Sequence, residues 1–168
     1  MTEREELAVL LWECGALRMG TGELPLDWDE EKTLQSGVRE KLLDALEALA
    51  RDHYAAAEAV LGGTWAALLA ERLGLPLNPA EIPERPLVVE PAVAEGDSLH
   101  ARTRPLRESG RSVAAAVIFQ YGLESARQKL DKADVRLHWL TDLETAAAVG
   151  LQQGILEFED YDRLLSVL

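Results

Sequence analysis

The sequence predicts an α/β protein in which helices cover both faces of a doubly wound, mainly parallel sheet. Strand-like apolar runs alternate with helical patterns along the second half of the chain, at residues 86–90, 98–109, 113–119, 122–130 and 135–140. The run Val113–Phe119 has apolar side chains on both faces, which is typical of a central parallel strand between two layers of helices. Because parallel neighbours need crossover connections, this alternation indicates right-handed β-α-β units.

The chain is expected to begin with a helix at residues 3–14, which ends at Gly15. A capping box formed by Thr2 and Glu5 starts this helix. A second amphipathic helix is expected around one apolar face, formed by Val38, Leu42, Ala45, Leu46 and Leu49. The loop 20–28 between the two helices contains Gly and Pro residues and has room for only a short strand.

The middle of the chain is less regular than its ends. Residues 55–61 are rich in alanine, which favours a helix, but their position between two helices and before Gly62-Gly63 favours a buried strand. We therefore expect a strand there, followed by a helix at 64–73 and a short Pro-rich connection at 78–85.

The C-terminal segment is predicted to form two helices. A second capping box, from Thr141 to Glu144, starts a helix that runs toward Gly154. The final helix has one apolar stripe, formed by Phe158, Tyr161, Leu164, Leu165 and Leu168.

Composition limits the classes of function. The chain has 168 residues, 48% of them hydrophobic, and no polar linker divides it, so we expect a single domain over residues 1–168. A net charge of −13 argues against binding to nucleic acid or to membrane surfaces. No apolar run reaches membrane-spanning length and the N-terminus is no basic leader, so a cytoplasmic location is expected. The only cysteine, Cys14, lies on the apolar stripe of the first helix and is expected in the core.

The segment Leu87–Ser98 has the outline of a phosphate-binding strand, loop and helix. Glu90 lies where the strand run ends, and Gly96 leads into the next helical pattern. The N-terminus of a helix offers free N–H groups and a positive dipole end, which suit an anion. A phosphate there would lie beside Glu95 and Asp97, however. At about 4–6 Å, each like-charge contact would cost about 3–4 kcal/mol at an effective dielectric constant near 20.

The order of segments resembles the orotate phosphoribosyltransferase family, within the type I phosphoribosyltransferase fold. Leu10–Gly20 is similar to the family's opening helix and its Gly-Ala-Leu turn. Gly62-Gly63 and Arg72–Leu77 are similar to its pyrophosphate loop and the segment after that loop. Val135–Leu168 is similar to its last strand and terminal helix pair. The resemblance implies this fold with a reduced hood region, and it also implies a homodimer.

The family's diagnostic motif is an apolar strand, two acidic residues, a short apolar pair and Thr-Thr-Gly-x-Ser. In the family, the acids hold ribose hydroxyls of phosphoribosyl pyrophosphate, and the Thr, Gly and Ser groups surround its 5′-phosphate. At the corresponding positions this chain has, in order, Glu90, Pro91, Ala94, Glu95, Gly96 and Ser98. The second acid and both threonines are therefore replaced, although the loop length is kept.

Two further parts of the family's site are missing from this sequence. The family has a mobile loop with Lys and His residues that closes over pyrophosphate, but the corresponding interval 78–85 contains neither. The family also has a Ser-Gly-Lys hairpin with aromatic residues that help to seat the base, whereas residues 21–33 contain Lys32 as their only basic residue. Displacement of pyrophosphate depends on cations placed where negative charge develops, so these losses argue against normal catalysis.

We therefore predict a divergent phosphoribosyltransferase-like protein without normal transferase activity, acting as a binding or regulatory homodimer. Two alternatives remain open. One is a reduced orotate or other base phosphoribosyltransferase that uses phosphoribosyl pyrophosphate and Mg²⁺, and the other is a sensor of a nucleotide, nucleoside or base. No catalytic residue, metal ligand or certain cofactor is assigned. The candidate ligand-binding residues are Gly62, Gly63, Thr64, Glu90, Glu95, Gly96, Asp97 and Ser98.

Several of these residues also have structural interpretations. Glu90 is either a ribose-hydroxyl acceptor or a strand-end acid that faces water, and Ser98 is expected to be an N-cap rather than an anion ligand. Gly62 and Gly63 are expected to turn the chain from strand to helix. Trp65 follows this turn, and its ring could fill the space of a pyrophosphate or pack against another subunit.

Metal and nucleophile chemistry finds little support in the sequence. Glu90, Glu95 and Asp97 could offer oxygen ligands to a divalent cation, but no ion-binding loop pattern fixes their geometry. The three histidines are too scattered in the sequence to indicate a metal or nucleophile site. We interpret His138, which lies in an apolar run, as a hydrogen-bonded structural residue.

Overall fold

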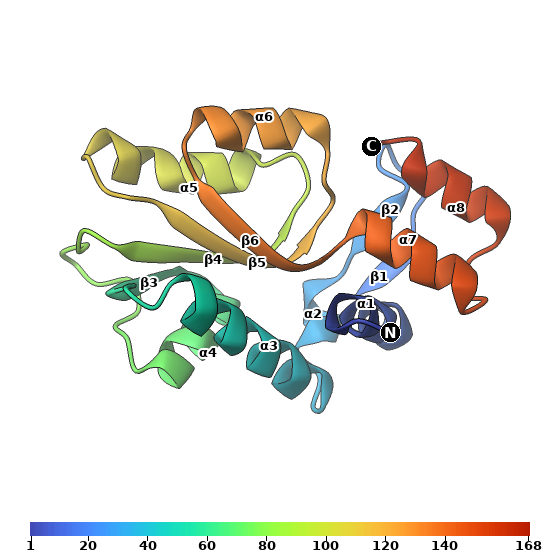
Figure 1. The fold of residues 1–168 in the computed structure, drawn as a ribbon, viewed down its shortest axis with the longest axis horizontal. Helices are drawn as coiled ribbons and strands as arrows, with labels where there is room; N and C mark the ends of the chain where they lie inside the picture. The colour runs from blue at the N-terminus through green and yellow to red at the C-terminus, as the bar shows by residue number, and fades with distance from the viewer.

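The structure, a computed structural model, describes residues 1–168 and is built around a four-stranded parallel sheet (Figure 1). The strands follow the order β3-β4-β5-β6. Their bounds are Ala59–Gly62, Pro86–Val93, Ala114–Gln120 and Arg136–Asp142. Every residue of β5 is buried, as expected for an apolar run that has strands on both sides and helices on both faces.

Helices lie on both faces of this sheet, which confirms the doubly wound arrangement (Figure 1). Helices α3 and α4 pack on one face, and α5 and α6 cover the other. Their bounds are Val38–His53, Thr64–Leu73, Asp97–Glu108 and Glu124–Lys132.

The winding direction of the chain reverses between β3 and β4. After α4, Leu77 forms an isolated parallel bridge with Val60 of β3, so this segment lies on the side of β3 away from β4. The chain then crosses to β4 and continues in the opposite direction through β5 and β6. In doubly wound sheets, ligands bind at such a switch point, beyond the carboxyl ends of the strands. The segments there are the turn Gly62–Thr64 and the loop after Val93.

The remaining elements form a hood beside the carboxyl ends of the strands (Figure 1). They are α1 (Glu3–Cys14), β1 (Leu17–Met19), β2 (Leu26–Trp28), α2 (Glu30–Thr33), α7 (Leu143–Gln152) and α8 (Phe158–Leu165). The short strands β1 and β2 pair in an antiparallel hairpin. Helix α1 packs along α7, where the indole N–H of Trp12 donates a hydrogen bond to the carbonyl oxygen of Ala146 at 2.8 Å.

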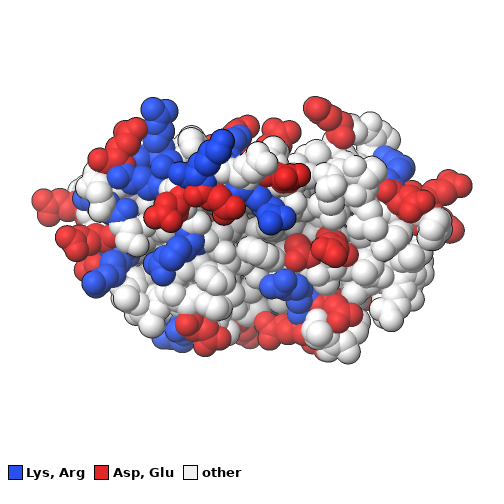
Figure 2. All heavy atoms as spheres, turned by 45° about the horizontal axis from the view of Figure 1, so that its top comes forward, with Lys and Arg blue, Asp and Glu red and all other residues white.

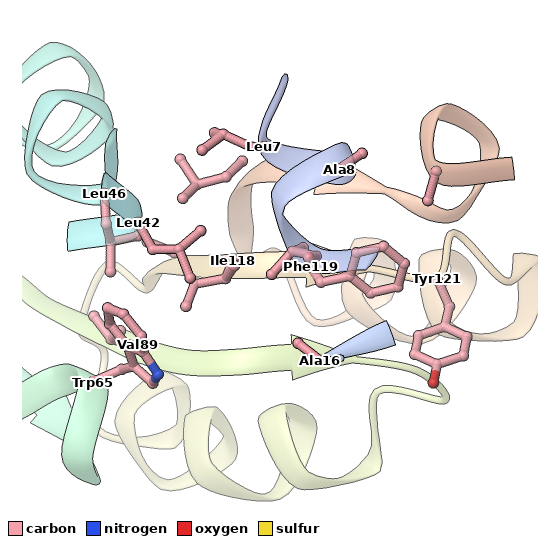
Figure 3. Packing of buried hydrophobic residues seen from close by; sticks show 14 of the residues in the cluster. Leu7, Ala8, Ala16, Leu42, Leu46, Trp65, Val89, Ile118, Phe119 and Tyr121 are labelled. Carbon is pink, nitrogen blue, oxygen red and sulfur yellow. The ribbon is translucent and has the colours of Figure 1, made fainter. Parts of the chain in front are cut away.

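The apolar core is divided unequally between the two sides of the sheet. One cluster of 33 buried residues joins the sheet to α3, α4 and the hood, whereas 11 buried residues form the cluster under α5 and α6. Phe119 belongs to the larger cluster (Figure 3). Its ring stacks on that of the partly buried Trp28, with centroids 5.7 Å apart. Because this cluster continues from β5 into α1 and α7, apolar burial holds the hood against the sheet.

Two strands differ from the prediction by three or more residues at one end. β4 continues through Pro91 to Val93, three residues beyond the predicted end at residue 90. Pro91 lacks an N–H group, but β3 ends at Gly62, opposite Val89, so no strand lies beside Pro91 on that side. β3 begins only at Ala59, because Ala55 and Ala56 lie in a turn after α3.

Two predicted helix caps are also corrected. The N-cap of α5 is Gly96, and Ser98 lies inside the helix. The N-cap of α7 is Asp142, which accepts a hydrogen bond from the N–H of Thr145 at 2.9 Å, so the predicted capping box from Thr141 is wrong. The hydroxyl of Thr141 instead donates to a carbonyl oxygen of α1.

The terminal helices agree with the prediction in position but only partly in burial. In the apolar stripe of α8, Leu164 is fully buried, whereas Phe158 is 64% exposed. Cys14 is half-buried and packs against the larger cluster. The hairpin β1-β2 and the short α2 were not predicted. No helix is both long enough and apolar enough to span a bilayer.

Candidate ligand site at the carboxyl ends of the sheet

The structure brings both predicted site segments to the switch point of the sheet. One segment is the turn between β3 and α4, and the other runs from the end of β4 into α5. Their predicted site residues are Gly62, Gly63, Thr64, Glu90, Glu95, Gly96, Asp97 and Ser98. The sequence separates the two segments by a helix and a Pro-rich connection, and the parallel pairing of β3 with β4 aligns their ends.

Glu90 is a buried acid held by two side chains of α5. Its side chain is only 9% exposed, and Arg102 Nε lies 3.3 Å from its Oε1. The hydroxyl of Ser98 donates a hydrogen bond to the same oxygen at 3.1 Å. The interpretations of Glu90 as an acid facing water and of Ser98 as an N-cap are therefore wrong. The Ser98 hydroxyl and Glu90 Oε1 thus form a charge-assisted contact within the chain.

Asp97 is paired with a cation of the neighbouring helix α6. The Lys129 ammonium group contacts the Asp97 carboxylate and lies 3.5 Å from the carbonyl oxygen of Glu95. The charge of Asp97 is therefore compensated, which the sequence did not indicate, whereas the exposed Glu95 side chain has no ion pair. Gly96 has φ +83°, and a Cβ there would lie 3.4 Å from the Cβ of Ala126, so the loop approaches α6 closely.

Gly62 is fixed by the contact between β3 and β4. It has φ +147°, and a Cβ at this position would collide with the carbonyl oxygen of Val89. The Asn78 side chain accepts a hydrogen bond from the Gly62 N–H at 3.0 Å and donates one to the Gly62 carbonyl at 2.9 Å. The N–H of Gly62 is thus engaged. Gly63 borders open space and Thr64 is exposed, so this turn remains accessible at its helix end.

Trp65 belongs entirely to the core of the chain. It is 1% exposed and points inward with Val89 and Leu42 (Figure 3). Its Nε1–H donates a hydrogen bond to Thr33 Oγ1 of α2 at 3.2 Å. Both interpretations of Trp65 from the sequence are therefore wrong, because its ring neither fills the space beyond the turn nor faces another subunit.

The acids at the switch point do not converge on a common point. No group of three or more His, Cys, Asp or Glu side chains is arranged to hold a metal ion. Glu90 contacts Arg102 and Ser98, and Asp97 contacts Lys129, so each carboxylate is directed to its own partner. The switch point thus has backbone N–H groups at the N-termini of α4 and α5. The cations Arg102 and Lys129 are both paired with acids of the chain.

Two histidines that are distant in sequence meet where the end of α3 packs on β6. The rings of His53 and His138 stack with centroids 3.8 Å apart, and the Tyr54 hydroxyl lies 2.7 Å from His138 Nδ1. Burial lowers the pKa of His138, and the neighbouring His53 and Arg136 lower it further. The prediction that His138 is a hydrogen-bonded structural residue is confirmed, while its contact with His53 has no signal in the sequence spacing.

Sequence reasoning missed Gln120, the last residue of β5. The residue is 8% exposed, and its Oε1 is buried without a hydrogen-bond partner. Such unpaired buried groups are rare, because the lost hydrogen bond to water is not replaced. The available signal was a polar residue at the end of a wholly apolar strand.

The face of the molecule that Figure 2 shows has no extended basic surface for a polyanion. Figure 2 shows Lys and Arg side chains over α5 and α6 with Asp and Glu side chains interspersed among them. Several of these side chains form ion pairs, such as that of Arg104 with Glu108 at 2.9 Å. The face in this view is therefore mixed in charge.

Comparisons with known proteins agree with the fold and with the order of segments. No family model matches the chain. The orotate phosphoribosyltransferase of Bacillus caldolyticus is 28% identical over 190 residues, which cover 94% of this chain and 92% of the relative. Because that span exceeds the 168 residues of this chain, the relative has internal segments that this chain lacks.

Solved structures show the same similarity. The crystal structure of orotate phosphoribosyltransferase from Aeropyrum pernix has a TM-score of 0.75 and 29% identity, and it covers 85% of this chain and 98% of its own. The structure of Leishmania donovani UMP synthase has a TM-score of 0.82 at 16% identity, covering 98% of this chain and 42% of its own, and supports the fold alone. The chain is thus similar over most of its length to orotate phosphoribosyltransferases, compared with which it is shortened and divergent, and it has the type I phosphoribosyltransferase fold.

Proposed function

We propose that this chain keeps the family's fold, has lost phosphoribosyl transfer, and acts by binding, as a homodimer. The observation that supports this most is the state of Glu90. This acid corresponds to the first ribose-binding acid of the family motif, yet it is buried and its Oε1 is engaged by Ser98 and Arg102. Both contacts are to Oε1, so a ribose hydroxyl would have to displace them to bind this oxygen.

The phosphate end of the loop has weaker anion-binding groups than the family motif. Ala94 and Glu95 replace the two threonines, and the Ser98 hydroxyl is directed at Glu90 rather than into the loop. The helix start contributes about 0.3–2 kcal/mol to binding an anion. The Glu95 carboxylate opposes that contribution, and the nearest ammonium group, Lys129, is paired with Asp97.

The pyrophosphate end also has little positive charge. The connection between Leu77 and β4 is the interval in which the family has its Lys- and His-containing loop, and it spans residues 78–85 with neither residue type. Arg85 is its only cation. Without cations to stabilise departing pyrophosphate, the transfer step would lose its main electrostatic support.

A coupled assay for pyrophosphate release tests the loss of transfer. The protein is mixed with phosphoribosyl pyrophosphate, Mg²⁺ and either orotate, uracil, adenine or hypoxanthine. We expect no release above the protein-free rate with any base. Release that disappears in a Glu90→Ala variant, but persists in Glu108→Ala on the exposed end of α5, would overturn the proposal.

A reduced transferase that uses Mg²⁺ is the second candidate. The features that favour it are the kept loop length, the left-handed Gly96 that preserves the turn, and the open helix start after Gly63. The same assay separates the two functions, because only this candidate requires turnover.

Pairing of two copies is the remaining part of the proposal, together with folding of residues 1–168 as one domain. The core cluster shared by hood and sheet supports a single folding unit. Exposed apolar side chains around α8, Ile155 at 42% and Phe158 at 64%, provide surface that association would cover. Light scattering at micromolar concentration should give twice the monomer mass of 18.5 kDa, and a strictly monomeric protein would contradict the pairing.

A further inference from the structure

A second cavity region lies outside the switch point, between α6, β6 and the start of α7. It consists of an apolar slot of about 280 Å³ beneath α6 and a more polar mouth of about 570 Å³ beside the C-terminus. The two share Gln120, Gly122, Arg127 and Trp139 as lining residues. No residue of the turn Gly62–Thr64 or of the loop 94–98 lines either of them.

The slot has a buried polar group at its junction with the mouth. Gln120 is more than nine-tenths buried, and its Oε1 has no hydrogen-bond partner within the chain. The walls around it are apolar or aromatic, formed by Val93, Leu123, Ala126, Leu130, Val135, Leu137 and Trp139. This oxygen has less than 1 Å² of accessible surface, so a ligand N–H group would satisfy it once the carboxamide turns toward the slot.

The charges around the slot and mouth select against anions. Glu124, Asp131, Asp142 and Glu144 line them, against the single cation Arg127. Asp142 is partly compensated by Arg4 at 3.4 Å, but Glu124 and Glu144 are exposed and have no ion pair. A phosphate or carboxylate group would therefore meet a surplus of negative charge, whereas hydroxyl groups would find acceptors.

We infer that this cavity is a binding site for an uncharged planar heterocycle that carries N–H groups, the chemistry of a nucleobase or its nucleoside. The ring lies in the apolar slot beside Trp139, one N–H donates to Gln120 Oε1, and any sugar hydroxyls face the acidic mouth. The site does not depend on whether phosphoribosyl transfer is lost, because it shares no residue with the switch-point loops.

Titration calorimetry with adenine, uracil, adenosine and AMP tests this site. We expect saturable binding of at least one uncharged probe, and AMP at least about fivefold weaker than adenosine at low salt. Gln120→Leu should weaken binding about tenfold, since one hydrogen bond to a buried acceptor is lost. Gln152→Leu, at an exposed position at the end of α7, should leave binding unchanged. AMP that binds as tightly as adenosine would contradict the charge argument.

The melting temperature of the unliganded Gln120→Leu variant distinguishes a role of Gln120 in ligand binding from a role in stability. Since Gln120 Oε1 is unpaired, Gln120→Leu should melt at the same temperature as the wild type or higher, while losing the ligand-induced shift. Gln120→Met, which is unbranched like the original side chain, serves if the leucine variant does not fold. Unchanged adenosine binding in either folded variant would overturn the inference.

Nuclear magnetic resonance of the wild-type protein locates the site directly. The indole N–H signal of Trp139, identified through Trp139→Phe, should move on addition of the tightest uncharged probe, and the buried Trp65 signal should not. Failure of all the uncharged probes to bind at millimolar concentration would overturn the inference. So would binding that moves only loop 94–98. Neither result bears on the pyrophosphate assay.

Discussion

Replacing Ser98 by Ala measures how much the hydrogen bond from its hydroxyl to Glu90 stabilises the folded chain. The Ser98 hydroxyl donates to Glu90 Oε1 at 3.1 Å, and the Glu90 side chain is only 9% exposed. Hydrogen bonds to charged groups contribute about 1.5–3 kcal/mol. Ser98 itself is exposed and Arg102 stays on the same oxygen, so water and the guanidinium replace part of the loss. We expect a cost of about 1 kcal/mol, or about 2–4 °C in melting temperature for a chain of this size.

Urea denaturation at pH 7 is the assay for Ser98→Ala. The matched control is Ser36→Ala, an exposed serine before α3 whose side chain forms no hydrogen bond, which should change stability by less than about 0.5 kcal/mol. A double-mutant cycle with Glu90→Gln should show a coupling of about 0.5 kcal/mol or more. If Ser98→Ala is as stable as the control, the Ser98 hydroxyl does not bind Glu90. The argument that Ser98 occupies Glu90 Oε1 in place of a ligand then fails.

Three further substitutions test other parts of the account. Gly62→Ala should cost about 2–4 kcal/mol in urea denaturation because its Cβ meets β4 and its φ is positive, whereas Gly63→Ala, beside open space, should cost less than half as much. Lys129→Met should change the free energy of unfolding by less than about 0.5 kcal/mol, because its partner carboxylate is 70% exposed; a loss above 1 kcal/mol would contradict this. The folded-state pKa of His138 is lowered, so the unfolded chain binds more protons and stability should fall as pH drops below about 6.5, levelling off below the folded pKa. Unfolding at pH 7.5 and 5.0 should show a smaller loss for His138→Gln than for the wild type, and equal losses would contradict the assignment.

The parallel sheet could be predicted because each strand and helix has a local pattern. The run 113–119 is apolar on both faces, and the structure buries all of β5. The end of β4 could not be predicted in this way. Pro91 normally excludes a strand interior, and it is tolerated only because β3 has already ended at Gly62, which is a property of the neighbouring strand.

The candidate site was predictable in position but not in its contacts. The Gly and acidic residues located the loop, and the parallel register placed it beside Gly62. The partners Arg102 and Lys129 lie on helices, where a single Arg or Lys has no distinguishing pattern. Gln120 was missed for a related reason. Whether a buried amide oxygen has a hydrogen-bond partner depends on how the chain packs, and no sequence pattern indicates it.

Titration calorimetry with phosphoribosyl pyrophosphate and Mg²⁺ tests the central claim most directly. For the wild type we predict no micromolar binding, because Glu90 and Ser98 are engaged with each other and Glu95 opposes the 5′-phosphate. Binding that emerges only after Ala94→Thr and Glu95→Thr would show that these positions disabled an ancestral site. Micromolar binding to the wild type that Ser98→Ala abolishes would contradict the account, because it would place the Ser98 hydroxyl on a ligand.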